Sequence, residues 1–249
     1  MKTKNNNNPY MVCKGINNAI AILRSKHFTI DRIDVLNNGR ATRENQINRL
    51  LIEEKTFFMG KKEFVQKHPE GRDQGIVIRF LGSVTKEVFP DYTNINNACL
   101  LALDNIEDPQ NFGQIIRTSE CAGIDGIIFP KHHSVPVTET VLQVSQGAFV
   151  NMPLYEVTNL SQTIHELKKN DFWVIGIENS VNAKKWYEMQ YTGKIVIVVG
   201  SEGRGMREKI TKICDFISTI PMQGTTNSLN VSAAVSAILF ERLRQIEGH

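Results

Sequence analysis

The stretch FISTIPMQGTTNSLNVSAAVSAILFE, residues 216–241, decides the fold of the C-terminal part of the chain. Its first residues are apolar and end at Pro221, which is typical of a short buried strand. A polar loop follows, and from Val231 apolar residues recur at helical spacing, so a helix is expected to start near Asn230. A strand, a polar loop and a helix start in this order place free backbone N–H groups around a cavity. The pattern alone also fits an ordinary strand-to-helix turn with Asn230 as its N-cap.

Upstream of this stretch, strands and helices alternate from residue 98 onward. Continuous apolar runs at Ala98–Leu103 and Ile195–Val199 predict strands that are covered on both faces. The remaining pattern predicts strands at 126–129, 154–157 and 172–177 and helices at 113–121, 138–148, 161–169 and 206–213. Repeated strand–helix units indicate an α/β fold with a mostly parallel sheet and helices on both faces. Ligands of such sheets bind outside the carboxyl ends of the strands.

The N-terminal part has its own alternation of elements. Predicted strands at 32–36, 56–59 and 75–80 and helices at 15–24, 44–54 and 61–67 indicate a small α/β module. Periodicity is lost between Leu81 and Asn97, as in a linker. We therefore expect a flexible tail at 1–10, a small domain at 11–81, a linker at 82–97 and a larger domain at 98–249.

Composition limits the class of protein. The 249 residues carry a net charge of +3, which is compatible with an RNA partner. The four cysteines form no CxxC pair, so we expect neither a metal site nor a disulfide framework. No run approaches the roughly 18 apolar residues of a membrane span. These features predict a globular cytoplasmic protein without a membrane segment.

Three loops at predicted strand ends carry unusual chemistry. In the first, DNIEDPQNFG (104–113), Asn111 can hydrogen-bond the backbone locally or reach a ligand. Arg117 follows about one turn inside the next helix. A guanidinium cannot easily lose its charge, so Arg117 either contacts a phosphate or ribose, or points to solvent and pairs with a carboxylate.

The second loop, VVGSEGRGM (198–206), is rich in glycine but has neither the Rossmann nor the Walker spacing. Gly200 and Gly205 allow close backbone approach. Glu202 would repel phosphates, so a neutral or cationic ligand fits this loop better. In the third loop, Ser228 and Asn230 supply small hydrogen-bonding groups beside the helix start.

Taken together and in this order, the three loops resemble the SpoU (TrmH-type) family of RNA 2′-O-ribose methyltransferases, which belongs to the SPOUT superfamily. The matching segments are NIEDPQNFGQIIRTSECAG (105–123), SQGAFVNMPLYEVTNL (145–160), IVIVVGSEGRGM (195–206) and IPMQGTTNSLNVSAAVSAILFE (220–241). Residues 14–80 resemble the L30e-like RNA-binding domain of the branch that methylates a guanosine of 23S ribosomal RNA. In that module Lys14 replaces the usual aromatic residue before Gly15.

The resemblance implies a C-terminal trefoil knot, a homodimer in which one subunit can complete the other's site, and S-adenosylmethionine as methyl donor. By motif match, the donor-binding residues are Gly200, Glu202, Gly205, Ile220, Met222 and Leu229.

The resemblance also implies catalytic roles. Arg117 would activate the ribose hydroxyl by contacting the adjacent phosphate and stabilising alkoxide character, because a guanidinium is a poor base. Asn111 would position nearby groups, Ser228 and Asn230 would orient Arg117 or the ribose, and Glu202 would anchor the site electrostatically. Candidate phosphate contacts in the first module are Lys14, Arg40, Arg43, Lys61 and Lys62.

Three alternatives stay open at this point. A transfer RNA 2′-O-methyltransferase would use the same catalytic half, although such enzymes commonly carry short basic extensions in place of the first module. A non-catalytic RNA-binding or assembly protein could retain the same fold. A dinucleotide-dependent α/β enzyme fits the order of elements but not the glycine spacing.

Overall fold

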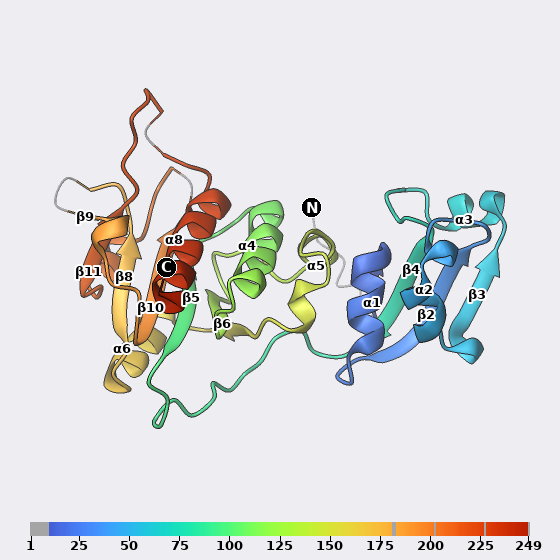
Figure 1. The fold of residues 1–249 in the computed structure, drawn as a ribbon, viewed down its shortest axis with the longest axis horizontal. Helices are drawn as coiled ribbons and strands as arrows, with labels where there is room; N and C mark the ends of the chain where they lie inside the picture. Colours follow the sequence, from blue (N-terminus) through green and yellow to red (C-terminus); the bar gives the residue numbers. More distant parts are fainter. Residues whose placement is uncertain (1–9, 181–182, 202, 227, 249) are drawn as a thin grey trace. The chain divides into compact units, whose positions relative to one another are not determined.

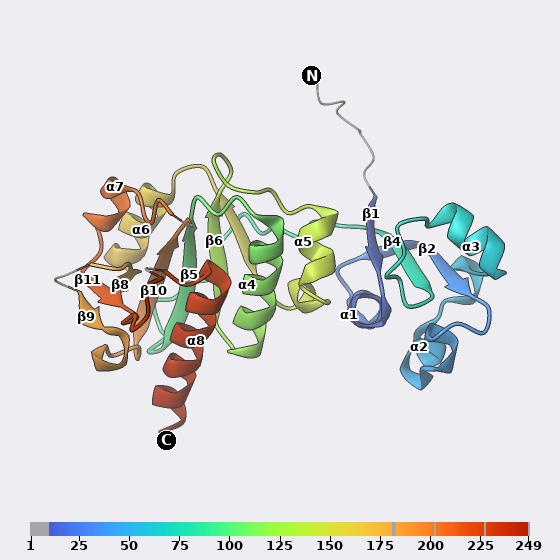
Figure 2. The same cartoon turned by 90° about the horizontal axis from the view of Figure 1, so that it is seen from above.

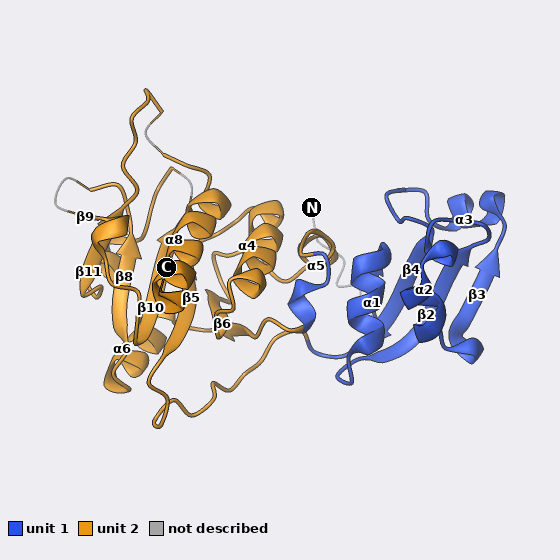
Figure 3. Ribbon diagram, viewed as in Figure 1, with its two compact units in different colours: residues 1–83, 146–150 blue, residues 84–145, 151–249 orange. Residues whose placement is uncertain are grey.

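The computed structural model describes residues 10–180, 183–201, 203–226 and 228–248 (Figure 1). The chain divides into two compact units, coloured separately in Figure 3. Unit 1 comprises Met1–Ser83 with Gln146–Val150, and unit 2 comprises Val84–Ser145 with Asn151–His249. Within the described residues, no helix combines the length and the apolar character needed to cross a membrane.

Unit 1 contains a four-stranded mixed sheet of order β1-β4-β2-β3. β4 pairs antiparallel with both β1 and β2, whereas β3 pairs parallel with β2. The strands are β1 (Met11–Lys14), β2 (Thr29–Leu36), β3 (Thr56–Met59) and β4 (Ile76–Leu81). The helical segments are α1 (Ile16–Arg24), η1 (Ala41–Arg43), α2 (Asn45–Leu50), η2 (Glu53–Lys55), α3 (Lys61–Lys67) and η3 (Ala148–Val150).

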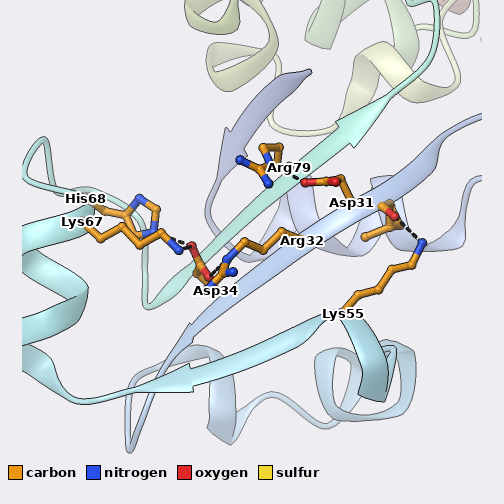
Figure 4. A network of polar contacts seen from close by, with 8 residues as sticks. Asp31, Arg32, Asp34, Lys55, Lys67, His68 and Arg79 are labelled. Atoms are coloured by element: carbon orange, nitrogen blue, oxygen red, sulfur yellow. Dashed lines mark hydrogen bonds and ion pairs between the residues drawn. The ribbon is translucent and has the colours of Figure 1, made fainter. Parts of the chain in front are cut away.

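A buried carboxylate organises the polar side of this sheet (Figure 4). The side chain of Asp34 on β2 is only 5% exposed, and it contacts Arg32 Nε at 2.7 Å, Lys67 Nζ at 2.7 Å and His68 Nε2 at 3.0 Å. Burial opposes ionisation of Asp34, but the hydrogen bonds from Lys67, Arg32 and His68 outweigh it and lower the pKa of the carboxyl. The network therefore ties β2 to the end of α3.

Unit 2 contains a seven-stranded sheet of order β7-β6-β5-β10-β8-β11-β9, and every pair in it is parallel. The strands are β5 (Ala98–Asp104), β6 (Gly126–Pro130), β7 (Leu154–Val157), β8 (Trp173–Ile177), β9 (Lys184–Lys185), β10 (Lys194–Gly200) and β11 (Phe216–Thr219). The helical segments are α4 (Pro109–Cys121), α5 (Glu139–Val144), α6 (Leu160–Lys169), η4 (Trp186–Glu188), α7 (Glu208–Thr211) and α8 (Val231–Glu247).

Helices cover both faces of this sheet, so the interior positions of its central strands β5 and β10 are apolar. All seven residues of β5 are buried. Alternate residues of β5 and β10 pack with α6 and α7 on one face, and α4 and α8 pack together over the other, as Figure 2 shows. The fold predicted from the continuous apolar runs, an α/β unit with a parallel sheet, is confirmed.

Several predicted boundaries were wrong for local reasons. Residues 109–112 are helical, not loop, because Asp108 caps α4 by accepting from Gln110 N at 2.8 Å and Pro109 occupies the first turn. The helices predicted at 44–54, 138–148 and 206–213 are shorter than expected. The strands β1 (Met11–Lys14) and β9 (Lys184–Lys185) were not predicted.

Candidate functional site

The candidate site lies at the carboxyl ends of three adjacent strands of unit 2, β10, β8 and β11. Because parallel neighbours end at the same edge of a sheet, the loops that follow them converge with the start of α8. They enclose a cavity of about 380 Å³. Its lining residues are Ile177, Glu178, Asn179, Val199, Gly200, Ser201, Gly203, Arg204, Gly205, Thr219, Ile220, Met222, Ser228, Leu229, Val231 and Ala234.

The loop after β10 turns back on itself so closely that glycine is required at both ends of the turn. Gly205 N donates to Ser201 O at 2.9 Å and closes the turn. A Cβ at Gly200 would lie 2.1 Å from the carbonyl carbon of Gly205, which no side chain tolerates. Gly205 itself has φ +67 and faces the Glu178 carboxylate. The two glycines therefore shape this wall of the cavity.

An ion pair between a buried carboxylate and a partly exposed arginine joins this loop to the end of β5. Asp104, whose side chain is 0% exposed, accepts from Arg207 N and from Arg207 Nε, each at 2.7 Å. A bidentate contact of this kind fixes orientation as well as distance. Asp104 thus holds the chain that leaves the glycine-rich turn against the strand that precedes α4.

Polar side chains also connect α4 to the start of α8. Asn230 caps α8 by accepting from Ser232 N at 2.9 Å, and its Nδ2 donates to Asn111 Oδ1 at 2.9 Å. One turn further along α4, Gln114 accepts from Ser232 Oγ at 2.9 Å. A second cavity, of about 240 Å³, opens beside Asn111 and shares Ser201, Arg204 and Val231 with the first.

The structure brings together most of the predicted donor-binding and catalytic residues. Six of them line the first cavity: Gly200, Gly205, Ile220, Met222, Ser228 and Leu229. Asn111 and Asn230 contact each other at the neighbouring cavity. Glu202 lies outside the described residues.

Arg117 is placed differently from the other predicted residues. It is exposed on α4 and lines neither cavity. It lies six residues beyond Asn111, a displacement of about 9 Å along a helix axis. Within one copy of the chain, Arg117 is therefore separate from the cavity wall.

The predicted phosphate contacts of unit 1 fall into two groups. Arg40, Arg43, Lys61 and Lys62 are exposed. The side chain of Lys14 is 18% exposed and forms an ion pair with Glu70. This ion pair competes with a phosphate for the ammonium group.

Glu178, Asn179 and Thr219 are among the lining residues that sequence reasoning missed. Glu178 and Asn179 directly follow the apolar strand β8, so its carboxyl end was the available signal. Thr219 ends β11, and its Oγ1 is buried without a hydrogen-bond partner among the described residues. Across the same residues, no group of three His, Cys, Asp or Glu side chains could hold a metal ion.

Comparison with known proteins shows that part of the chain matches the model of a protein family. Residues 98–240 match the model of the SpoU rRNA Methylase family. A Staphylococcus aureus protein assigned to the TrmH family of tRNA/rRNA methyltransferases is 46% identical over 146 residues, which are 59% of this chain. The match spans 58% of that relative, which is less than two thirds of its length.

Two solved structures share the fold over different lengths. The AdoMet-bound rRNA methyltransferase from Sinorhizobium meliloti has a TM-score of 0.76 at 20% identity, and the match covers 96% of this chain and 88% of that one. The A. aeolicus TrmH/SpoU tRNA-modifying enzyme has a TM-score of 0.56 at 30% identity, and the match covers 60% of this chain and 76% of that one.

Proposed function

Because residues 98–240 match its model, the chain belongs to the SpoU rRNA Methylase family, and we propose that it transfers a methyl group from S-adenosylmethionine to a ribose 2′-hydroxyl of RNA. The observation that carries this proposal is that the matched residues include every element that lines the 380 Å³ cavity.

The cavity has the features expected of a site for this donor. Its volume lies within the range of roughly 300–1,000 Å³ typical of small-molecule pockets. The glycine-rich turn leaves a backbone cradle that a Cβ at Gly200 would fill. Thr219 Oγ1 is buried and needs a hydrogen-bond partner, which a bound ligand would supply. Ile220, Met222 and Leu229 would hold the apolar parts of the donor. When bound, the donor supplies an electrophilic methyl group on a positively charged sulfur.

The residues around the second cavity would position the acceptor. Asn111 and Asn230 are fixed by their mutual hydrogen bond, and their amides would orient the ribose. Ser228 lines the donor cavity and would assist them. Glu202 would contribute the electrostatic role that the family motif implies.

We infer further that the chain acts as a homodimer. Arg117 is exposed and lines neither cavity of its own chain, so a second copy would receive its guanidinium. There it would contact the phosphate next to the acceptor ribose and stabilise negative charge on the hydroxyl oxygen. The proposal includes the knotted path of the C-terminal chain that the family implies.

The substrate that we propose is a guanosine of 23S ribosomal RNA, with unit 1 as the RNA-binding domain. The similarity to the Sinorhizobium meliloti rRNA methyltransferase includes unit 1, whereas the similarity to the A. aeolicus tRNA-modifying enzyme covers 60% of this chain. Transfer RNA remains the second candidate, because that enzyme shares 30% identity with this chain.

The test is transfer of radiolabelled methyl groups to unmodified 23S ribosomal RNA and to unmodified transfer RNA, followed by mass spectrometry of the nucleosides. We expect 2′-O-methylguanosine in the ribosomal RNA alone. Label in transfer RNA alone would favour the second candidate. Absence of label from both RNAs, together with absence of donor binding in calorimetry, would identify a non-catalytic RNA-binding protein.

A further inference from the structure

The donor cavity contains a carboxylate that no family motif accounts for. Glu178 follows β8 and lines the cavity, between the apolar Ile177 and the polar Asn179. Its backbone N donates to Ser218 O at 3.0 Å, which extends the pairing of β8 with β11. The start of the Glu178 side chain is therefore fixed by the sheet.

The Glu178 carboxylate is directed at the glycine-rich turn. Its Oε1 lies so close to Gly205 that a Cβ on that glycine would be 2.7 Å away. The side chain is half-buried. The negative charge of Glu178 also affects the Cys214 thiol. Burial raises the pKa of this thiol to about 12, and the negative charges of Asp215 and Glu178 raise it as well.

Among the described residues, no cation of the protein neutralises this charge. Across the parts of the chain that the structure describes, no side chain forms an ion pair or hydrogen bond with the Glu178 carboxylate. Arg204 lines the same cavity but does not pair with it. A half-buried carboxylate that lacks a partner favours a cationic ligand, since filling the cavity removes water and strengthens the attraction.

On the premise that the proposed function is correct, we propose that Glu178 is a specificity-determining residue that recognises a positively charged group of the methyl donor. S-adenosylmethionine has two such groups, the sulfonium and the α-ammonium. The product S-adenosylhomocysteine keeps the ammonium but has an uncharged sulfur. A carboxylate that contacts the sulfonium would therefore favour exchange of product for fresh donor, because the product binds it less strongly.

The test compares Glu178→Gln with the wild-type protein by calorimetry against three ligands: S-adenosylmethionine, S-adenosylhomocysteine and methylthioadenosine. Glutamine keeps the size of the side chain and removes its charge. We expect the affinity for S-adenosylmethionine to fall about tenfold, as for a hydrogen bond to a charged group. The affinity for methylthioadenosine, which has neither charge, should stay unchanged.

The affinity for the product, S-adenosylhomocysteine, identifies which positive group of the donor Glu178 recognises. Unchanged affinity for S-adenosylhomocysteine assigns Glu178 to the sulfonium, and an equal loss for donor and product assigns it to the ammonium. The conservative variant Glu178→Asp should retain part of the charge-dependent affinity. Glu156→Gln, an exposed position on β7 at the far edge of the sheet, is the matched control.

Two results would overturn the inference. Equal affinities of wild-type protein and Glu178→Gln for all three ligands would show that the carboxylate recognises nothing. An equal loss for all three would show a contribution to shape alone. Failure of the wild-type protein to bind S-adenosylmethionine would overturn the proposed function as well, so the two failures are distinguishable.

Discussion

Each unit of the molecule buries an aspartate against cations, but the two carboxylates connect different parts of the chain. Asp34 in unit 1 lies among Arg32, Lys67 and His68, all within one small sheet and the helix beside it. Asp104 in unit 2 pairs with Arg207, which follows the glycine-rich turn more than 100 residues later in the sequence. The first network stabilises a domain, whereas the second also positions the wall of a cavity. Burial and pairing alone therefore do not distinguish a structural carboxylate from one that supports a site.

The largest effect should come from Asp104→Asn. The substitution leaves the partly exposed Arg207 without its counter-charge, and loss of charged hydrogen bonds at a buried carboxylate costs about 3 kcal/mol of unfolding free energy. Because the glycine-rich turn loses its anchor, we also expect at least a tenfold loss of affinity for S-adenosylmethionine. Both tryptophans, Trp173 and Trp186, lie in unit 2, so tryptophan fluorescence reports its unfolding in urea. If the donor affinity were unchanged, Asp104 would have no more effect on the donor cavity than Asp34, which would contradict the distinction between the two aspartates.

Asp34→Asn should destabilise unit 1 by about 2 kcal/mol and leave donor affinity unchanged. Hydrogen exchange of the β2 amides measures the first effect and calorimetry the second. The pKa of Asp34 is lowered in the folded protein, so its contribution is complete above the unfolded pKa of about 4 and is lost as pH falls through the folded pKa. The difference between wild type and variant should therefore shrink in acid; a difference that grows in acid would contradict this account.

The smallest effect concerns the exposed cations of unit 1. Lys61 and Lys62 are free of the Asp34 network, so a double alanine variant should bind RNA a few-fold more weakly and lower the salt dependence of log K by about 2. Lys14→Ala is the matched control, since Lys14 already pairs with Glu70. Titration of 23S ribosomal RNA at several salt concentrations measures both. An equal effect of the two variants would contradict the separation of exposed from paired cations.

Local sequence patterns predicted more of the fold of unit 2 than of its candidate site. Apolar runs such as Ile195–Val199 are unambiguous because a strand covered on both faces needs apolar residues at every position. The apolar spacing after Asn230 predicted a helix start there, with Asn230 as the N-cap in one of the two interpretations, and the structure shows this cap. The start of α4 was missed although Asp108 and Pro109 carry a helix-start signal.

The features that were not predicted depend on contacts between residues that lie far apart in the sequence. The pairing of Asp104 with Arg207 and the position of Glu178 follow from strand order, which periodicity does not give. The same holds for Gln146–Val150, a segment from the C-terminal half of the sequence whose Phe149 ring lies 6.0 Å from that of Phe28 in unit 1. The exposure of Arg117 likewise depends on which side of α4 faces α8.

The most direct test of the account is calorimetric titration of S-adenosylmethionine into Ala234→Phe and Ala233→Phe. Ala234 lines the cavity at the start of α8, so a phenylalanine there would fill the space proposed for the donor. Its neighbour Ala233 is exposed and lies outside the cavity. Both variants should keep the circular dichroism spectrum of the wild type. We expect Ala234→Phe to lose donor binding and Ala233→Phe to retain it; full binding by Ala234→Phe would contradict the claim that this cavity takes the methyl donor.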